Sequence, residues 1–118
     1  MVNSLWENPL FNICFSVGLI FIVAGFVMFR FPPKKINSLY GYRTKSSMKN
    51  LERWNFVETF SAKEMMKLGF FLMLSSLLTF ITNFNNTINL IIGLSLTLGG
   101  LIILFIKVEN AIKIKFGN

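Results

Sequence analysis

The chain has 118 residues, of which 53% are hydrophobic and only 14% charged, whereas an ordinary soluble domain has about 25% charged residues. This composition excludes a typical soluble protein and predicts an integral membrane protein. The net charge of +7 favours anionic headgroups of the lipid bilayer over nucleic acid as the partner, because the charges lie beside hydrophobic runs. We expect one all-α membrane domain, residues 1–118, with three transmembrane helices and a cytoplasmic loop containing a short helix.

The first span is an uncharged run near the N-terminus. No charge occurs between Glu7 and Arg30, and residues 9–29 would form about 31 Å of helix, enough to cross a hydrocarbon core of about 30 Å. A cleaved signal peptide is the alternative. It is disfavoured because the run is too long for a signal core and its positive charges follow it. The single cysteine, Cys14, is expected to be a small buried hydrophobe.

The predicted cytoplasmic loop, residues 30–61, begins with the helix-stopping sequence Phe31-Pro32-Pro33. Its segment Gly41-Tyr42-Arg43-Thr44 combines a permissive backbone position, a ring with a hydroxyl group, and a guanidinium group suited to phosphate or carboxylate. These residues are candidates for binding a phospholipid headgroup or an acidic partner. The alternative is a turn that only pins the loop to the membrane surface.

A short helix is expected inside this loop. Ser46 and Ser47 offer an N-cap for a helix that runs through Phe60, with Glu52 and Arg53 on its wetter sides. The apolar residues of this helix recur every three positions, so they drift around it and do not form one stripe. We therefore expect it to pack partly on the ends of the spans and partly on lipid.

The second and third spans lie in the remaining apolar sequence. Ser61 and Glu64 fit a capping box, which predicts a second span over about residues 62–81. An asparagine-rich turn follows, and Thr87 is the expected N-cap of a third span over residues 88–106. Residues 107–118 are then a cytoplasmic tail.

Orientation follows from the distribution of lysine and arginine. Nine basic residues fall between the first and second apolar runs: Arg30, Lys34, Lys35, Arg43, Lys45, Lys49, Arg53, Lys63 and Lys67. The N-terminus and the asparagine-rich turn have none. The positive-inside rule therefore predicts a multi-pass protein with its N-terminus outside, its C-terminus in the cytoplasm, and Trp6 at the outer interface.

Small residues indicate where helices approach one another. Gly18 and Gly25 lie seven apart in the first span, and Ser95 and Gly99 form a small-xxx-small pair in the third. Such positions let helix backbones come close in lipid. They predict contacts within a three-helix bundle, with a homodimer as the alternative.

The sequence offers no catalytic chemistry. It has no histidine and one cysteine, and Glu52, Glu58 and Glu64 are spread along a predicted helix without a nucleophile or an acid–base pair. We expect no enzyme activity, no catalytic residue, no cofactor and no metal site.

The loop resembles the signature segment of the SdpI family of bacterial membrane proteins, named for a protein that confers immunity to a secreted toxin peptide. The resemblance covers roughly residues 26–80 and is carried by Pro33, Asn37, Gly41-Tyr42-Arg43-Thr44, the Ser47-Met48-Lys49-Asn50 sequence and Trp54.

The resemblance implies a protein of the bacterial cytoplasmic membrane that protects against a membrane-active toxin peptide. The alternative is a membrane scaffold or signalling protein that recruits a cytosolic regulator through its basic loop. Larger family members carry further spans ahead of this unit, so a short three-span form is expected. The candidate residues for binding a partner or a lipid headgroup are Asn37, Gly41, Tyr42, Arg43, Thr44 and Trp54.

Overall fold

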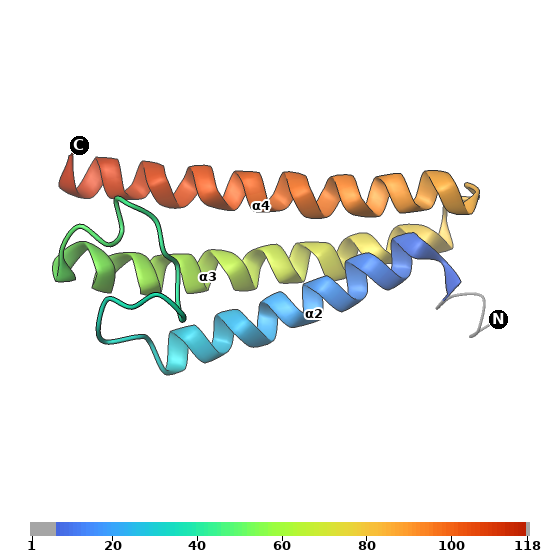
Figure 1. Ribbon diagram of the computed structural model, residues 1–118. Helices are drawn as coiled ribbons and strands as arrows, with labels where there is room; N and C mark the ends of the chain where they lie inside the picture. Colours follow the sequence, from blue (N-terminus) through green and yellow to red (C-terminus); the bar gives the residue numbers. More distant parts are fainter. Residues whose placement is uncertain (1–6, 118) are drawn as a thin grey trace.

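The computed structural model describes residues 7–117, and this part of the chain contains helices and no strand. Helix α2 (Pro9–Arg30) is followed by helix α3 (Leu51–Ser75), which continues as the 3-10 helix η1 (Ser76–Phe80), and by helix α4 (Asn86–Phe116). The three long helices lie lengthwise beside one another in a body of 51 × 26 × 20 Å (Figure 1). The all-α prediction is confirmed. Trp6 lies outside the described residues.

Two of the helices, α2 and α4, are long and apolar enough to cross a membrane. Helix α3 differs because charged residues occur along it as far as Lys67. Only 13 uncharged residues, 68–80, remain before its 3-10 extension ends, whereas an independent span needs about 20 apolar residues. The second predicted span, residues 62–81, and with it the three-span arrangement therefore stay predictions.

Helix α3 begins later than the predicted loop helix and does not stop before the second span. Its N-cap is Asn50, whose Oδ1 accepts a hydrogen bond from the backbone N–H of Arg53 (2.8 Å). Ser47 instead closes a preceding turn by accepting the N–H of Thr44 (2.8 Å). The prediction of a separate short helix capped by Ser46 and Ser47 is wrong, because the chain stays helical from Leu51 to Ser75.

The predicted capping box lies in the middle of α3. Ser61 Oγ donates to the carbonyl of Glu58 (3.4 Å), and Glu64 forms an ion pair with Lys67 (3.0 Å). A serine followed three residues later by a glutamate also suits these contacts within a helix. The predicted helix start at residue 62 is therefore wrong.

Helix α4 is longer at both ends than the predicted third span. Its N-cap is Asn85, which accepts the N–H of Ile88 (2.9 Å), so Thr87 is already helical. The helix passes the predicted end at residue 106 and continues to Phe116. A charged residue such as Lys107 ends an apolar run without ending a helix, and Val108 beyond it is fully buried.

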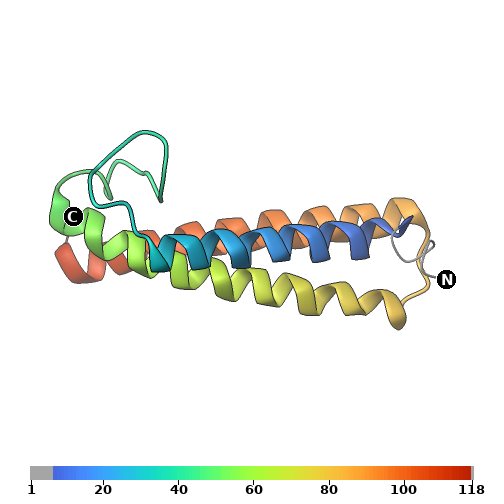
Figure 2. The same ribbon diagram turned by 90° about the horizontal axis from the view of Figure 1, so that it is seen from below.

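Helices α2 and α3 approach closely through small residues. A Cβ atom added to Gly18 would lie 2.6 Å from the carbonyl oxygen of Gly69, and one added to Gly25 would lie 2.9 Å from that of Ala62. Gly18 and Gly25 therefore serve contacts within the bundle, as predicted. Seen from below, α2 lies across one side of the pair formed by α3 and α4 (Figure 2).

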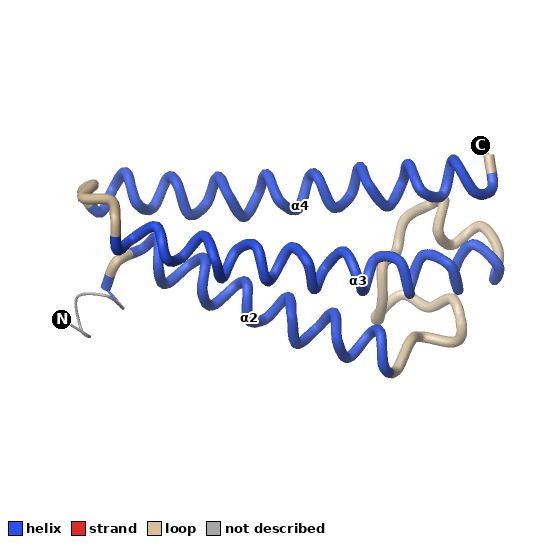
Figure 3. The backbone as a smooth tube through the Cα atoms, turned by 180° about the vertical axis from the view of Figure 1, so that it is seen from behind, coloured by secondary structure: helices blue, strands red, loops and turns tan. Residues whose placement is uncertain are grey.

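The connections separate to the two ends of the bundle. The loop of residues 31–50 lies beside the C-terminal end of α4, while the turn of residues 81–85 lies at the other end, near the start of α2 (Figure 1). The loop passes from the end of α2 across to α4 and returns to the start of α3 (Figure 3). The basic loop and the basic C-terminal segment thus share one end of the molecule.

Candidate functional site

The first part of the loop is shaped by its own side chains. Asn37 Oδ1 accepts the backbone N–H groups of Leu39 (2.9 Å) and Tyr40 (2.7 Å), an arrangement typical of an asparagine-stabilised turn. Tyr40 Oη donates to the carbonyl of Phe31 (2.7 Å), one of the groups left without a helical partner at the end of α2. Asn37 therefore acts within its turn in this structure.

Trp54 anchors the loop to α3. Its side chain is fully buried, and its indole N–H donates to the carbonyl of Pro33 (2.8 Å). Pro33 is itself buried. A buried indole combines a large apolar area with one hydrogen bond that must be satisfied, so this contact fixes where the chain leaves α2.

Gly41 brings the loop backbone onto Glu58 of α3. Its φ angle is +104°, a region that residues with a Cβ atom rarely adopt. A Cβ atom here would clash with Glu58 Oε1 and would lie 2.9 Å from Pro33 Cγ. The next residue, Tyr42, donates its backbone N–H to Glu58 Oε1 (2.6 Å). This position therefore requires glycine for both its backbone angle and its close packing.

Three loop hydroxyl groups converge on Glu109 of α4. Tyr42 Oη and Thr44 Oγ1 donate to Glu109 Oε2 at 2.7 and 3.0 Å, and Ser46 Oγ donates to Oε1 at 2.6 Å. Hydrogen bonds to a carboxylate are stronger than those between neutral groups. Burial and the bond to Glu109 raise the pKa of Tyr42, so its hydroxyl remains a donor. We call these three hydroxyl groups with Glu109 the loop clamp.

Glu58 is a buried carboxyl group beneath the loop. Its side chain is fully buried, and Oε2 has no hydrogen-bond partner among the described residues. Burial raises the pKa of Glu58 to about 7, against the opposing effects of the Tyr42 N–H group and the positive charge of Arg43. Near neutral pH this group is therefore divided between its protonated and ionised forms.

The two arginines near the loop have different surroundings. Arg43 is exposed and donates through Nη1 to the carbonyl of Ser38. Arg53 is buried, with its guanidinium carbon 5.5 Å from the centre of the Phe116 ring. The prediction that Arg53 lies on a wetter side is wrong, because the extension of α4 covers it; Glu52 is exposed, as expected.

The structure brings the predicted residues together but turns most of their polar groups inward. Tyr42, Thr44 and Trp54 all bond to other parts of the fold, whereas the head group of Arg43 remains at the surface. Sequence analysis missed the two carboxylates that hold the loop, Glu58 and Glu109. One feature of the sequence could have drawn attention to Glu109: it is the only acidic residue after Glu64.

Known proteins resemble this chain over the loop, α3 and most of α4. The profile of the SdpI/YfhL protein family matches residues 34–107. The uncharacterized protein YfhL of Bacillus subtilis (strain 168) is 36% identical over 97 residues, which cover 82% of this chain and 83% of that protein. No solved structure matches the chain significantly. With its two apolar helices and this match, the chain is a membrane protein that belongs to the SdpI/YfhL family.

Proposed function

We propose that this protein gives resistance to a membrane-active toxin peptide and that its helical bundle, rather than its loop, is the acting part. The observation that carries this proposal is the loop clamp. In it, the hydroxyl groups of Tyr42, Thr44 and Ser46 donate hydrogen bonds to Glu109. Polar groups satisfied inside the fold are not available to a soluble partner. The loop then serves to hold the bundle, and the membrane-facing surfaces remain to meet a peptide.

The proposed orientation places the loop and the C-terminal end of α4 in the cytoplasm. The distribution of charge supports it, because Lys and Arg gather at the end of the bundle that holds both segments. The turn of residues 81–85 then faces outward, with Asn83 and Phe84 exposed. An external peptide would meet this turn first. With α3 crossing between them, the protein would have three spans.

Recruitment of a cytosolic regulator is the second candidate, and the outer surface of the loop favours it. Leu39 is 89% exposed, Ile36 is exposed, and Arg43 presents its charge nearby in the sequence. Apolar and basic groups together suit an acidic amphipathic partner. The two functions therefore depend on opposite ends of the molecule.

The test compares resistance in a deletion strain complemented with matched variants. Cells would be challenged with a panel of membrane-active peptides after each variant is shown to reach the membrane at the normal level. We expect Phe84→Ser to reduce resistance, while the loop variant Leu39→Ser retains it. Equal peptide sensitivity of the deletion and parent strains would overturn the proposal, and loss of resistance only with Leu39→Ser would favour the second candidate.

A further inference from the structure

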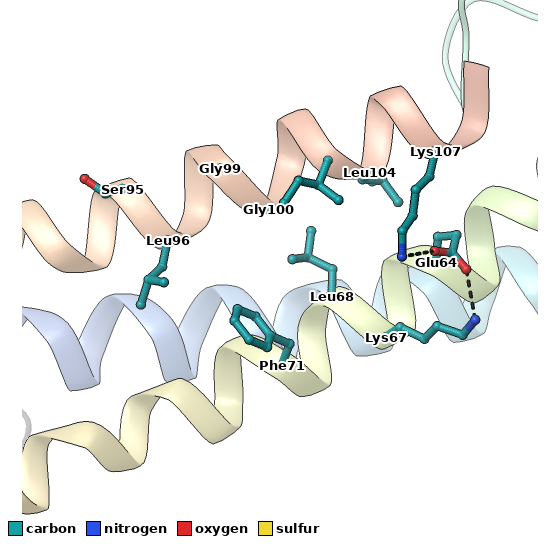
Figure 4. Close-up of a pocket in the computed structure, with 11 residues that line it drawn as sticks. Glu64, Lys67, Leu68, Phe71, Ser95, Leu96, Gly99, Gly100, Leu104 and Lys107 are labelled. Carbon is teal, nitrogen blue, oxygen red and sulfur yellow. Dashed lines mark hydrogen bonds and ion pairs between the residues drawn. The ribbon is translucent and has the colours of Figure 1, made fainter. Parts of the chain in front are cut away.

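A groove of about 450 Å³ lies between α3 and α4, and all of its lining residues come from these two helices (Figure 4). Leu68 and Phe71 of α3 and Leu96 and Leu104 of α4 give it apolar walls. Gly99 leaves part of it open, because a Cβ atom added there would meet no atom within 4 Å. Its volume falls within the range of ordinary ligand sites, about 300–1,000 Å³.

One end of this groove is charged. Lys67 and Lys107 converge on Glu64, with Nζ-to-carboxylate distances of 3.0 and 3.4 Å (Figure 4). The Glu64 side chain is 10% exposed, whereas those of Lys67 and Lys107 are 73% and 60% exposed. Two ammonium groups and one carboxylate leave one net positive charge. Each ammonium group has three donors, so both lysines retain donors for an anion.

The length of the groove is close to the thickness of one membrane leaflet. From Ser95 to Lys107 it follows 12 residues of α4, about 18 Å at the helical rise. Half of a hydrocarbon core of about 30 Å is about 15 Å. Lys107 stands 21 residues after Asn86, about 32 Å along the helix, so it reaches headgroup level when the start of α4 lies at the opposite interface.

We propose that this groove binds an anionic phospholipid, with an acyl chain between α3 and α4 and its phosphate group at Lys67 and Lys107. The apolar walls match the acyl chain, and the net positive charge at the groove's end matches the phosphate. This site is separate from the loop residues and does not depend on a role in toxin resistance.

A second copy of the chain fits the groove less well. In a two-fold symmetric dimer about the membrane normal the same surface would meet itself. Lys67 and Lys107 would then lie beside the equivalent lysines of the other copy, and like charges brought together oppose association. The charge at the groove's end thus favours an anionic occupant.

The test measures binding of phosphatidylglycerol and of phosphatidylcholine to the full-length protein in detergent by native mass spectrometry. We expect preferential binding of phosphatidylglycerol. Lys107→Gln should weaken that binding about fivefold, the factor that corresponds to about 1 kcal/mol for one lysine at an anionic headgroup. Lys113→Gln is the matched control, because Lys113 is exposed and does not line the groove.

A second variant tests the apolar part of the groove. Gly99→Leu places a side chain in open space and improves helix propensity, so the protein should fold while the groove fills. It should reduce phosphatidylglycerol binding, and Gly99→Ala should reduce it less. Equal binding of both lipids, or unchanged phosphatidylglycerol binding by folded Gly99→Leu and Lys107→Gln proteins, would overturn the proposal. Loss of self-association in Gly99→Leu with unchanged lipid binding would identify a second copy as the occupant.

Discussion

Replacing Glu109 with alanine should release the loop from α4. The change removes the acceptor of three hydrogen bonds, and a hydrogen bond to a charged group contributes about 1.5–3 kcal/mol. Glu109 is only partly buried and the freed hydroxyl groups can bond to water, so the bonds do not add in full. We expect a loss of about 2–3 kcal/mol in the free energy of loop opening. This corresponds to an open population about 30- to 160-fold larger.

Limited trypsin digestion in detergent micelles measures that population, because Arg43, Lys45 and Lys49 are cleavage sites in or beside the clamp. When the loop opens and closes quickly relative to cleavage, the digestion rate follows the open fraction. Glu109→Gln should show a smaller increase, since it keeps one acceptor oxygen. Glu52→Ala removes an exposed carboxylate elsewhere and serves as the control. Equal digestion rates for the Glu109→Ala and Glu52→Ala proteins would refute the clamp.

Two further predictions concern Glu58 and Gly41. The folded-state pKa of Glu58 is raised from 4.5 to about 7, so the folded protein holds this proton more tightly and the stabilising effect is complete below pH 4.5. That stabilisation should be lost as pH rises from 4.5 through 7, which lowers the free energy of unfolding by about 3 kcal/mol. The Glu58→Gln protein should not show this loss. If the free energies of unfolding of the parent and Glu58→Gln proteins in micelles followed parallel curves against pH, the prediction would be contradicted. Gly41→Ala should lower the unfolding free energy by about 2 kcal/mol or more, because of its positive φ and the clash with Glu58. Gly99→Ala, which meets no atom, should be neutral or stabilising by up to about 1 kcal/mol, and equal thermal unfolding of these two variants would count against the Gly41 argument.

The parts of the fold predictable from sequence are those set by local rules. The uncharged run after Glu7 and the helix stop at Phe31-Pro32-Pro33 predicted a helix over residues 9–29. The observed helix α2 has the same start and ends one residue later, at Arg30. Gly18 and Gly25 were placed on the packing face because residues seven apart share one side of a helix. Composition alone indicated the helical class, since few other structures satisfy the backbone in lipid.

Helix ends and the site partners were harder to predict. Local capping patterns were ambiguous, because Ser61 and Glu64 make contacts inside α3 that use the same residue types as a cap. The clamp joins Tyr42 to Glu109 across 67 residues of sequence, and no local spacing links them. Only the docking of α4 beside the loop brings that carboxylate within reach.

The loop clamp and the charged end of the groove lie on opposite sides of the same turn of α4. Lys107 points to Glu64 at the groove, while Glu109, two residues and about 200° further round the helix, points to the loop. Between them Val108 is fully buried and packs in one apolar cluster with Val57 of α3. Rotation of α4 would break the Glu64 ion pair, the clamp or this cluster. The loop clamp therefore helps to fix the position of the charged end of the groove.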